Sequence, residues 1–186
     1  KESKRESLST FLVNGFMLFG ALIIFIGLLQ INKPEMLKQA KPILIMGMLC
    51  ILVLLAAKGF VFMATQKQLL SLHAVPLLIP LALAPLVAAV LLGSYFAIAT
   101  GIWVTFCVAI MLDNSFAMML QGILLTVVAV LSAKDIHQRS SVIRAGVWIG
   151  ATQVLFALVI GFSNQQTPES MIQQAGIGFG GGLLVA

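Results

Sequence analysis

Long runs of apolar residues, most of them close to 20 residues in length, are the feature of this sequence that most restricts its fold. The first runs from Phe11 to Gln30 and has Asn14 as its one strongly polar interior residue. A helix of that length rises about 30 Å, the thickness of the hydrocarbon core of a bilayer. The runs do not alternate polar with apolar residues and are about twice as long as a barrel strand. Because lipid cannot satisfy backbone polar groups, we predict membrane-spanning helices.

Composition extends this prediction to the whole chain. Of its 186 residues, 60% are apolar and only 9% are charged, against roughly 45–50% and 25% in soluble domains. We therefore predict an all-α, polytopic membrane helical bundle without a soluble domain. The runs give seven spans, over residues 11–30, 42–64, 76–93, 96–112, 116–133, 145–162 and 171–186. The last is short for a span, so six is the alternative count if it does not cross.

We expect two parts in this chain. Residues 1–10 form an extracytoplasmic juxtamembrane tail, and residues 11–186 form the transmembrane domain, with its last helix truncated. The sequence begins with Lys1, has no signal-peptide pattern before the first span, and stops inside an apolar run at Ala186. These features indicate an internal piece of a longer protein.

Basic residues are distributed unevenly between the two sets of loops. The loops over residues 31–41 and 134–144 hold three Lys or Arg residues each, whereas Lys67 is the one basic residue in the loops of the opposite side. Since Lys and Arg accumulate in cytoplasmic loops, the amino end is predicted outside and the carboxyl end in the cytoplasm. Residues 1–5 carry three basic residues outside, which we attribute to translocation of a preceding exported domain.

Two residues are candidates for an intramembrane polar site. Lys58 is the one formally charged residue well inside a span, where a charge costs at least about 2.5–3.5 kcal/mol. Either Lys58 faces the bundle in a functional role, or its stem extends to the interface and leaves the ammonium in water. Gln153 is the second candidate, and it belongs to a set of polar residues expected to hydrogen-bond between helices. The others are Asn14, Thr100, Thr105, Gln121, Thr126 and Thr152.

Prolines and glycines mark two further features. Pro80 and Pro85 each remove a backbone hydrogen bond in the third predicted span and are expected to kink it. The kinks either form a hinge or a broken-helix binding site, or merely shape the bundle. Glycines spaced four residues apart, in the sixth span and over residues 176–182, predict close helix packing, within the chain or across a homodimer.

No group of residues in the sequence suits catalysis. His73 and His137 lie in loops on opposite sides, and the apolar surroundings of Cys50 and Cys107 favour a packing role for both. No carboxylate pair or nucleophile with an adjacent base is present. We therefore predict no catalytic residue, no metal site, no cofactor and no nucleic-acid partner for this chain, and a lipid bilayer as its surroundings.

The loop over residues 132–146 is the most distinctive stretch of the sequence. Its basic residues Lys134, Arg139 and Arg144 are candidates for contact with lipid phosphate or with a cytoplasmic domain. The alternative is that they only anchor the topology.

Three features of the sequence between Pro76 and Phe162 form a recognisable pattern. Arg139-Ser140, Ile143 and Ala145-Gly146 open a span that contains Gln153. The run PLLIPLALAPLVAAVLL is opened by a proline, and a short break follows at Gly93-Ser94. In these features the sequence resembles the membrane region of the seven-transmembrane receptors with an intracellular HD hydrolase domain.

The resemblance implies a bacterial inner-membrane receptor with three parts. An exported sensory domain precedes the helices, and a cytoplasmic HD phosphohydrolase, which in relatives cleaves cyclic di-AMP with two metal ions, follows them. This chain would then be the module that couples the two, and no catalytic residue of the HD domain carries over to it. The alternative is a transporter or permease subunit with a substrate site near Lys58 and the helix broken by Pro80 and Pro85.

The charge distribution makes a testable prediction about topology. In intact cells, a cysteine introduced by Ser140→Cys should resist a membrane-impermeant thiol reagent, and one introduced by Gln166→Cys should react, because the two loops are expected on opposite sides. The reverse labelling pattern would disprove the predicted orientation.

Overall fold

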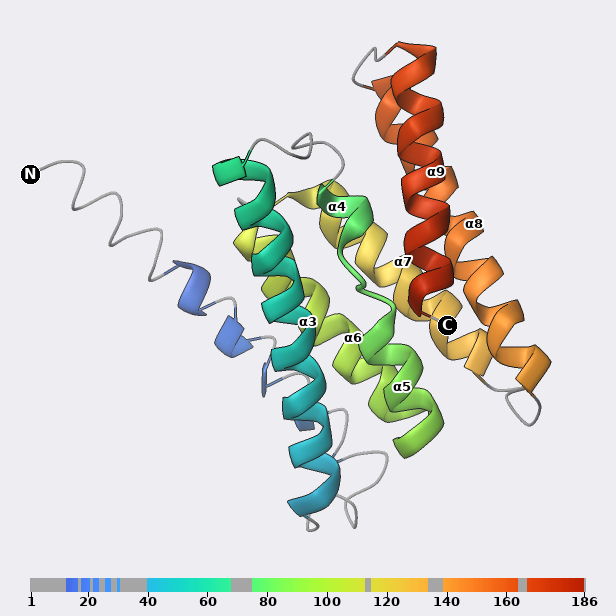
Figure 1. The fold of residues 1–186 in the computed structure, drawn as a ribbon. Helices are drawn as coiled ribbons and strands as arrows, with labels where there is room; N and C mark the ends of the chain where they lie inside the picture. The colour runs from blue at the N-terminus through green and yellow to red at the C-terminus, as the bar shows by residue number, and fades with distance from the viewer. Residues whose placement is uncertain are drawn as a thin grey trace, which may run out of the picture.

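Helices account for the regular structure in the part of the chain that is described (Figure 1). The computed structural model describes residues 13–16, 18–20, 22–23, 26–27, 30, 40–67, 75–112, 115–133, 139–163 and 167–185. These ranges contain no strand. The predicted all-α membrane bundle is therefore confirmed. Of the first predicted span, only a few residues between 13 and 30 are described, and they are helical.

The helices follow the apolar runs closely. They are α3 (Ala40–Lys67), α4 (Val75–Leu78), α5 (Leu83–Leu92), α6 (Ser94–Met111), α7 (Phe116–Ala133), α8 (Arg139–Ser163) and α9 (Pro168–Val185). The bounds of α7 are those predicted, whereas α8 and α9 begin earlier than expected. Both extend into polar residues, because a helix can continue past the apolar region that buries it in lipid.

Among the described residues, four helical segments are long and apolar enough to cross a bilayer. They are Lys41–Met63, Ser94–Met111, Phe116–Ala133 and Ile143–Phe162. The third predicted span is divided into α4 and α5, of which α5 is a shorter apolar helix. The helix α9 has 18 residues but is not among the four, since glycines and glutamines dilute its apolar side chains.

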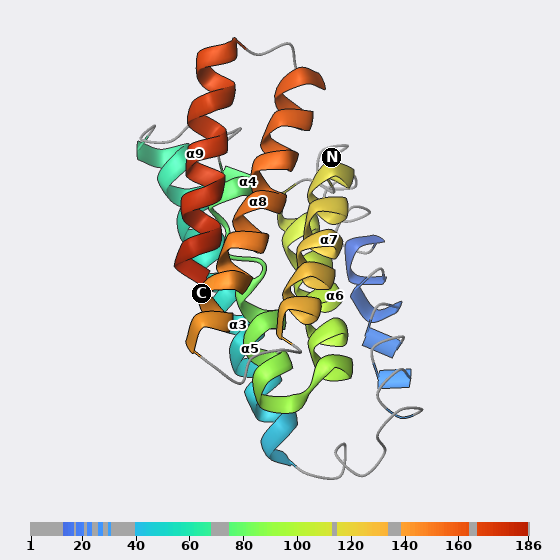
Figure 2. The ribbon, with the colours of Figure 1, turned by 90° about the vertical axis from the view of Figure 1, so that its right-hand side faces the viewer.

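Helices adjacent in sequence pack side by side. The helices α5, α6 and α7 contact one another, α3 lies against α5 and α6, and α8 connects α7 to α9. In both ribbon views α8 and α9 run alongside each other and extend past the other helices at one end (Figures 1 and 2). Val53 of α3, Ile79 of the segment between α4 and α5, and Leu125 of α7 are fully buried in the main core cluster.

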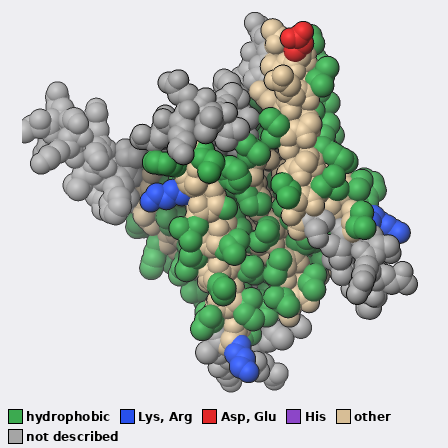
Figure 3. Space-filling view, in the orientation of Figure 1, with side chains coloured by type: hydrophobic (Ala, Val, Ile, Leu, Met, Phe, Trp, Pro, Cys, Tyr) green, Lys and Arg blue, Asp and Glu red, His purple; other side chains and the backbone are tan. Residues whose placement is uncertain are grey.

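Hydrophobic side chains also cover most of the described surface on the face of the bundle that Figure 3 shows. Leu55 of α3 is 65% exposed and Trp148 of α8 is 60% exposed. A soluble protein rarely exposes apolar patches this extensive. The helices therefore present to the bilayer the apolar surface that a water-soluble bundle would bury.

The chain reverses between α5 and α6 at a single residue, Gly93. Its φ of 97° is in the region that side chains disfavour. The Gly93 N–H donates to the carbonyls of Ala88 and Ala89, both at 3.1 Å, and so closes the end of α5. The sequence break expected at Gly93-Ser94 is thus a tight helix-to-helix turn.

Two reciprocal contacts join α6 to α7. A Cβ on Gly101 of α6 would collide with the side chain of Thr126, and a Cβ on Gly122 of α7 would collide with that of Thr105. All four residues are buried. The threonines of one helix therefore fit against the glycines of the other, which sets the close approach of the two helices.

Three threonine hydroxyls correct one expectation from the sequence. Thr100, Thr126 and Thr152 were expected to hydrogen-bond between helices. Instead their hydroxyls donate within their own helices, to the carbonyls of residues 96, 122 and 148 at 2.6, 2.8 and 2.9 Å. In lipid a hydroxyl four residues after a carbonyl always has that acceptor nearby, so the local bond forms first.

The contact between α6 and α7 predicts a difference between two glycines. Gly101→Ala should destabilise the protein by about 1–3 kcal/mol, because the new methyl overlaps Thr126. Gly59→Ala on α3 is the matched control, since nothing lies within 4 Å of its Cβ position. Thermal unfolding in detergent should show a lower Tm for the first variant only. Equal Tm values for both variants would contradict this packing.

Candidate functional site

The interruption between α4 and α5 is the most unusual feature of the backbone. Pro80 has no N–H, so it cannot donate to the carbonyl of the preceding helical turn. The Leu81 N–H donates to the Ile79 carbonyl at 2.8 Å, and the Leu83 N–H donates to the Pro80 carbonyl at 3.1 Å. The Leu77 carbonyl, whose helical donor would have been the Leu81 N–H, is thereby released from the α-helical pattern.

The two prolines of this segment have different effects. Pro80 lies in the non-helical interruption, whereas Pro85 lies in the first turn of α5, where an N–H is not needed. The helix resumes at once, with the Leu86 N–H donating to the Ala82 carbonyl at 3.0 Å. The segment therefore contains one complete break rather than two kinks. Leu77, Ile79 and Leu81 are at most 2% exposed, so the break is enclosed by protein.

Glycines bring α9 against α8 and α4. A Cβ on Gly182 would overlap the Gly150 backbone, and one on Gly178 would lie 3.3 Å from the Gln153 Cβ. A Cβ on Gly181 would lie 3.1 Å from the Leu77 carbonyl oxygen and 3.2 Å from Gln153 Oε1. The polar group of Gln153 and the released carbonyl of Leu77 therefore both face the same glycine of α9.

Gln153 is buried at this contact, with an exposed fraction of 1%. Neither its Oε1 nor its Nε2 has a hydrogen-bond partner among the residues that the structure describes. Gln174 on α9 is 6% exposed, and its Oε1 likewise has no partner within the described ranges. A buried amide without a partner is costly. We define Gln153, Leu77 and Gly181 as the break site.

Lys58 does not belong to the break site. Its side chain is exposed on α3, whereas Gln153 is buried between α8 and α9. The two polar residues that the sequence suggested as one intramembrane site thus lie in separate environments.

The basic loop is only partly described. Arg144 is exposed on α8, and Arg139 is the first residue of that helix, although its side chain lies outside the described part of the chain. Lys134 also lies outside it. In the space-filling view the described Lys and Arg side chains lie toward the margins, away from the apolar middle (Figure 3).

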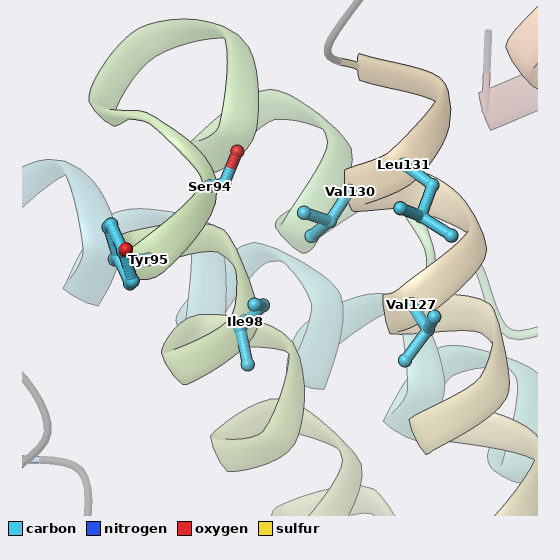
Figure 4. Close-up of a pocket in the computed structure, with 6 residues that line it drawn as sticks. All are labelled: Ser94, Tyr95, Ile98, Val127, Val130 and Leu131. Atoms are coloured by element: carbon cyan, nitrogen blue, oxygen red, sulfur yellow. The ribbon is translucent and has the colours of Figure 1, made fainter.

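A shallow groove of about 380 Å³ opens between the start of α6 and the end of α7 (Figure 4). Its lining residues are Ser94, Tyr95, Ile98, Val127, Val130 and Leu131. Only a hydroxyl and a phenol interrupt its apolar surface, so it contains neither a nucleophile with a base nor an acid pair. Within the described ranges, no three His, Cys, Asp or Glu side chains come together as a possible metal site.

These observations define a polytopic helical membrane protein whose most distinctive internal feature is a proline-broken helix beside a buried glutamine. The family model described as a 7TM receptor with intracellular HD hydrolase matches residues 8–186. The chain therefore belongs to this family and is its membrane region, with the hydrolase domain separate from it. No curated protein and no solved structure matches the chain.

Sequence reasoning identified Gln153 and Pro80 but missed Leu77 and Gly181, the other two residues of the break site. The release of the Leu77 carbonyl can be predicted from the sequence, since Pro80 also displaces the next residue, Leu81, whose N–H would have been the helical donor to that carbonyl. Which glycine of residues 176–182 meets that carbonyl depends on the rotation of α9, and no pattern in the sequence indicated it.

Proposed function

We propose that this chain is the signal-transducing membrane module of a bacterial inner-membrane receptor. It couples an exported sensory domain to a cytoplasmic HD phosphohydrolase of the same protein, and the substrate of that hydrolase is cyclic di-AMP. The observation that carries the proposal is the family match over residues 8–186, since that family joins a seven-helix receptor region to an intracellular hydrolase.

The proposed arrangement has residues 1–10 outside the membrane and residues 11–186 as the transmembrane domain. The basic loops at 31–41 and 134–144 face the cytoplasm, and α9 leads toward the hydrolase. This orientation is supported by the uneven distribution of Lys and Arg between the loops. It puts Lys134, Arg139 and Arg144 on the side where the hydrolase would lie.

The transporter alternative has less support. It needs Lys58 and the broken helix to form one substrate site, but Lys58 is exposed while the break is buried. We therefore develop the receptor proposal alone.

The division of labour between the domains can be tested with purified protein. The chain 1–186 should not hydrolyse cyclic di-AMP when Mn²⁺ is added, because the proposed activity resides in the separate HD domain. The full-length protein should hydrolyse it under the same conditions. Metal-dependent turnover by the chain alone, or none by the full-length protein, would refute the proposal.

The basic loop provides a second test. Arg139→Ala in the full-length protein should alter hydrolase output while membrane insertion is retained, because five other basic residues still define the topology. Arg139→Lys should also alter it, since lysine lacks the planar, multi-donor contacts of arginine. The measurement is dinucleotide turnover in membranes, with Lys38→Ala as the control in the other basic loop. If both Arg139 variants show the turnover of the wild type, the basic loop only anchors the topology and the proposed role in coupling is wrong.

A further inference from the structure

Gln153 and the Leu77 carbonyl are complementary groups that do not pair. The carboxamide offers a donor, Nε2, and the released carbonyl is an acceptor. Both approach one point on α9, the Cβ position of Gly181, within 3.2 Å. The backbone of α9 therefore lies close to both groups, and the carboxamide has no partner among the described residues.

Only weak contacts replace the missing hydrogen bond. The Cβ position of Gly181, 3.1 Å from the Leu77 carbonyl oxygen and 3.2 Å from Gln153 Oε1, holds only a hydrogen of the Cα, and C–H···O contacts are worth much less than an N–H···O bond. Close packing of Gly182 against Gly150 holds α9 against α8. In the observed position α9 packs closely, but the two buried polar groups are not paired. A position in which α9 packs less closely and the two groups pair should therefore have a similar free energy.

We propose that Gln153 and Leu77 form a latch that controls the position of α9. In the position seen here, α9 is inserted and the latch is open. In a second position, α9 withdraws from α4 and Gln153 Nε2 donates to the Leu77 carbonyl. Each position has an interaction that the other lacks, which is what a two-state switch requires.

The link from this latch to hydrolase output rests on the proposed function, whereas the two positions of α9 do not. In the proposed function α9 leads toward the cytoplasmic domain, so its displacement would be passed on to that domain. A stimulus would then act by favouring one of the two positions.

Two substitutions should move the equilibrium in opposite directions. Gln153→Met keeps the length of the side chain but removes both polar groups, so it abolishes the latch and favours inserted α9. Gly181→Ala adds a methyl 3.1 Å from the Leu77 carbonyl oxygen and favours withdrawal. The matched controls are Gln173→Met, an exposed glutamine of α9, and Gly180→Ala, which has nothing within 4 Å of its Cβ position.

The position of α9 can be measured by electron paramagnetic resonance in the full-length protein. Spin labels at Leu91 on α5 and Leu184 on α9, which are 59% and 87% exposed, report the separation of α9 from the α4–α5 segment. Cys50 and Cys107 are first replaced by alanine. We expect two distance populations, with the shorter one increased roughly tenfold relative to the longer in Gln153→Met. Gly181→Ala should shift the ratio the other way, and both controls should match the parent protein.

An unchanged ratio in Gln153→Met, or shifts in the same direction for both variants, would overturn the latch. If Gly181→Ala does not fold, the Gln153→Met result alone decides. Cyclic di-AMP turnover in the same samples separates the two levels of the proposal. Distance shifts without any change in turnover would leave the latch standing and refute the coupling to the hydrolase.

Discussion

Every backbone N–H and C=O group at membrane depth must find its partner within the protein, and the rest of this structure depends on that requirement. It makes the long apolar runs helical and allows an irregular backbone only where protein encloses it. The break at Pro80 obeys this condition, because Leu77, Ile79 and Leu81 are almost fully buried. Enclosure has a further effect: the carbonyl that Pro80 releases is directed at neighbouring helices rather than at lipid. The most irregular backbone in the described part of the chain is therefore also the part whose free carbonyl can interact with a neighbouring helix when that helix moves.

Packing between the helices follows from the same surroundings. Apolar side chains gain little by leaving lipid for one another, so association depends on close fit. Glycines provide that fit twice, where α9 meets α8 and where α6 meets α7. The two contacts differ in one respect. Between α6 and α7 the nearby threonine Thr126 satisfies its hydroxyl within its own helix, whereas beside α9 the amide of Gln153 has no such local solution. Threonine commonly bonds the backbone of its own helix, and Gln153 does not do so here.

The sequence predicted the helices well because their lengths follow directly from apolar run lengths, as the bounds Phe116–Ala133 of α7 illustrate. It also identified Pro80 and Gln153 as unusual. It was wrong about Thr100, Thr126 and Thr152, because hydropathy does not reveal that an acceptor four residues earlier competes with a partner helix. The effect of Pro85 depended on the residue at which α5 begins. The contact between Leu77 and Gly181 depended on the rotation of α9 about its own axis. Neither is encoded in local periodicity.

The reciprocal arrangement of Gly101 with Thr126 and of Gly122 with Thr105 also restricts how this protein can evolve. Each glycine has room for its partner threonine only because it lacks a Cβ. A larger residue at position 101 requires a smaller one at 126, and the same holds for 122 and 105. The two residues of each pair therefore cannot be substituted independently of each other. Across descendants of this chain they should change together, as compensating exchanges of volume between α6 and α7.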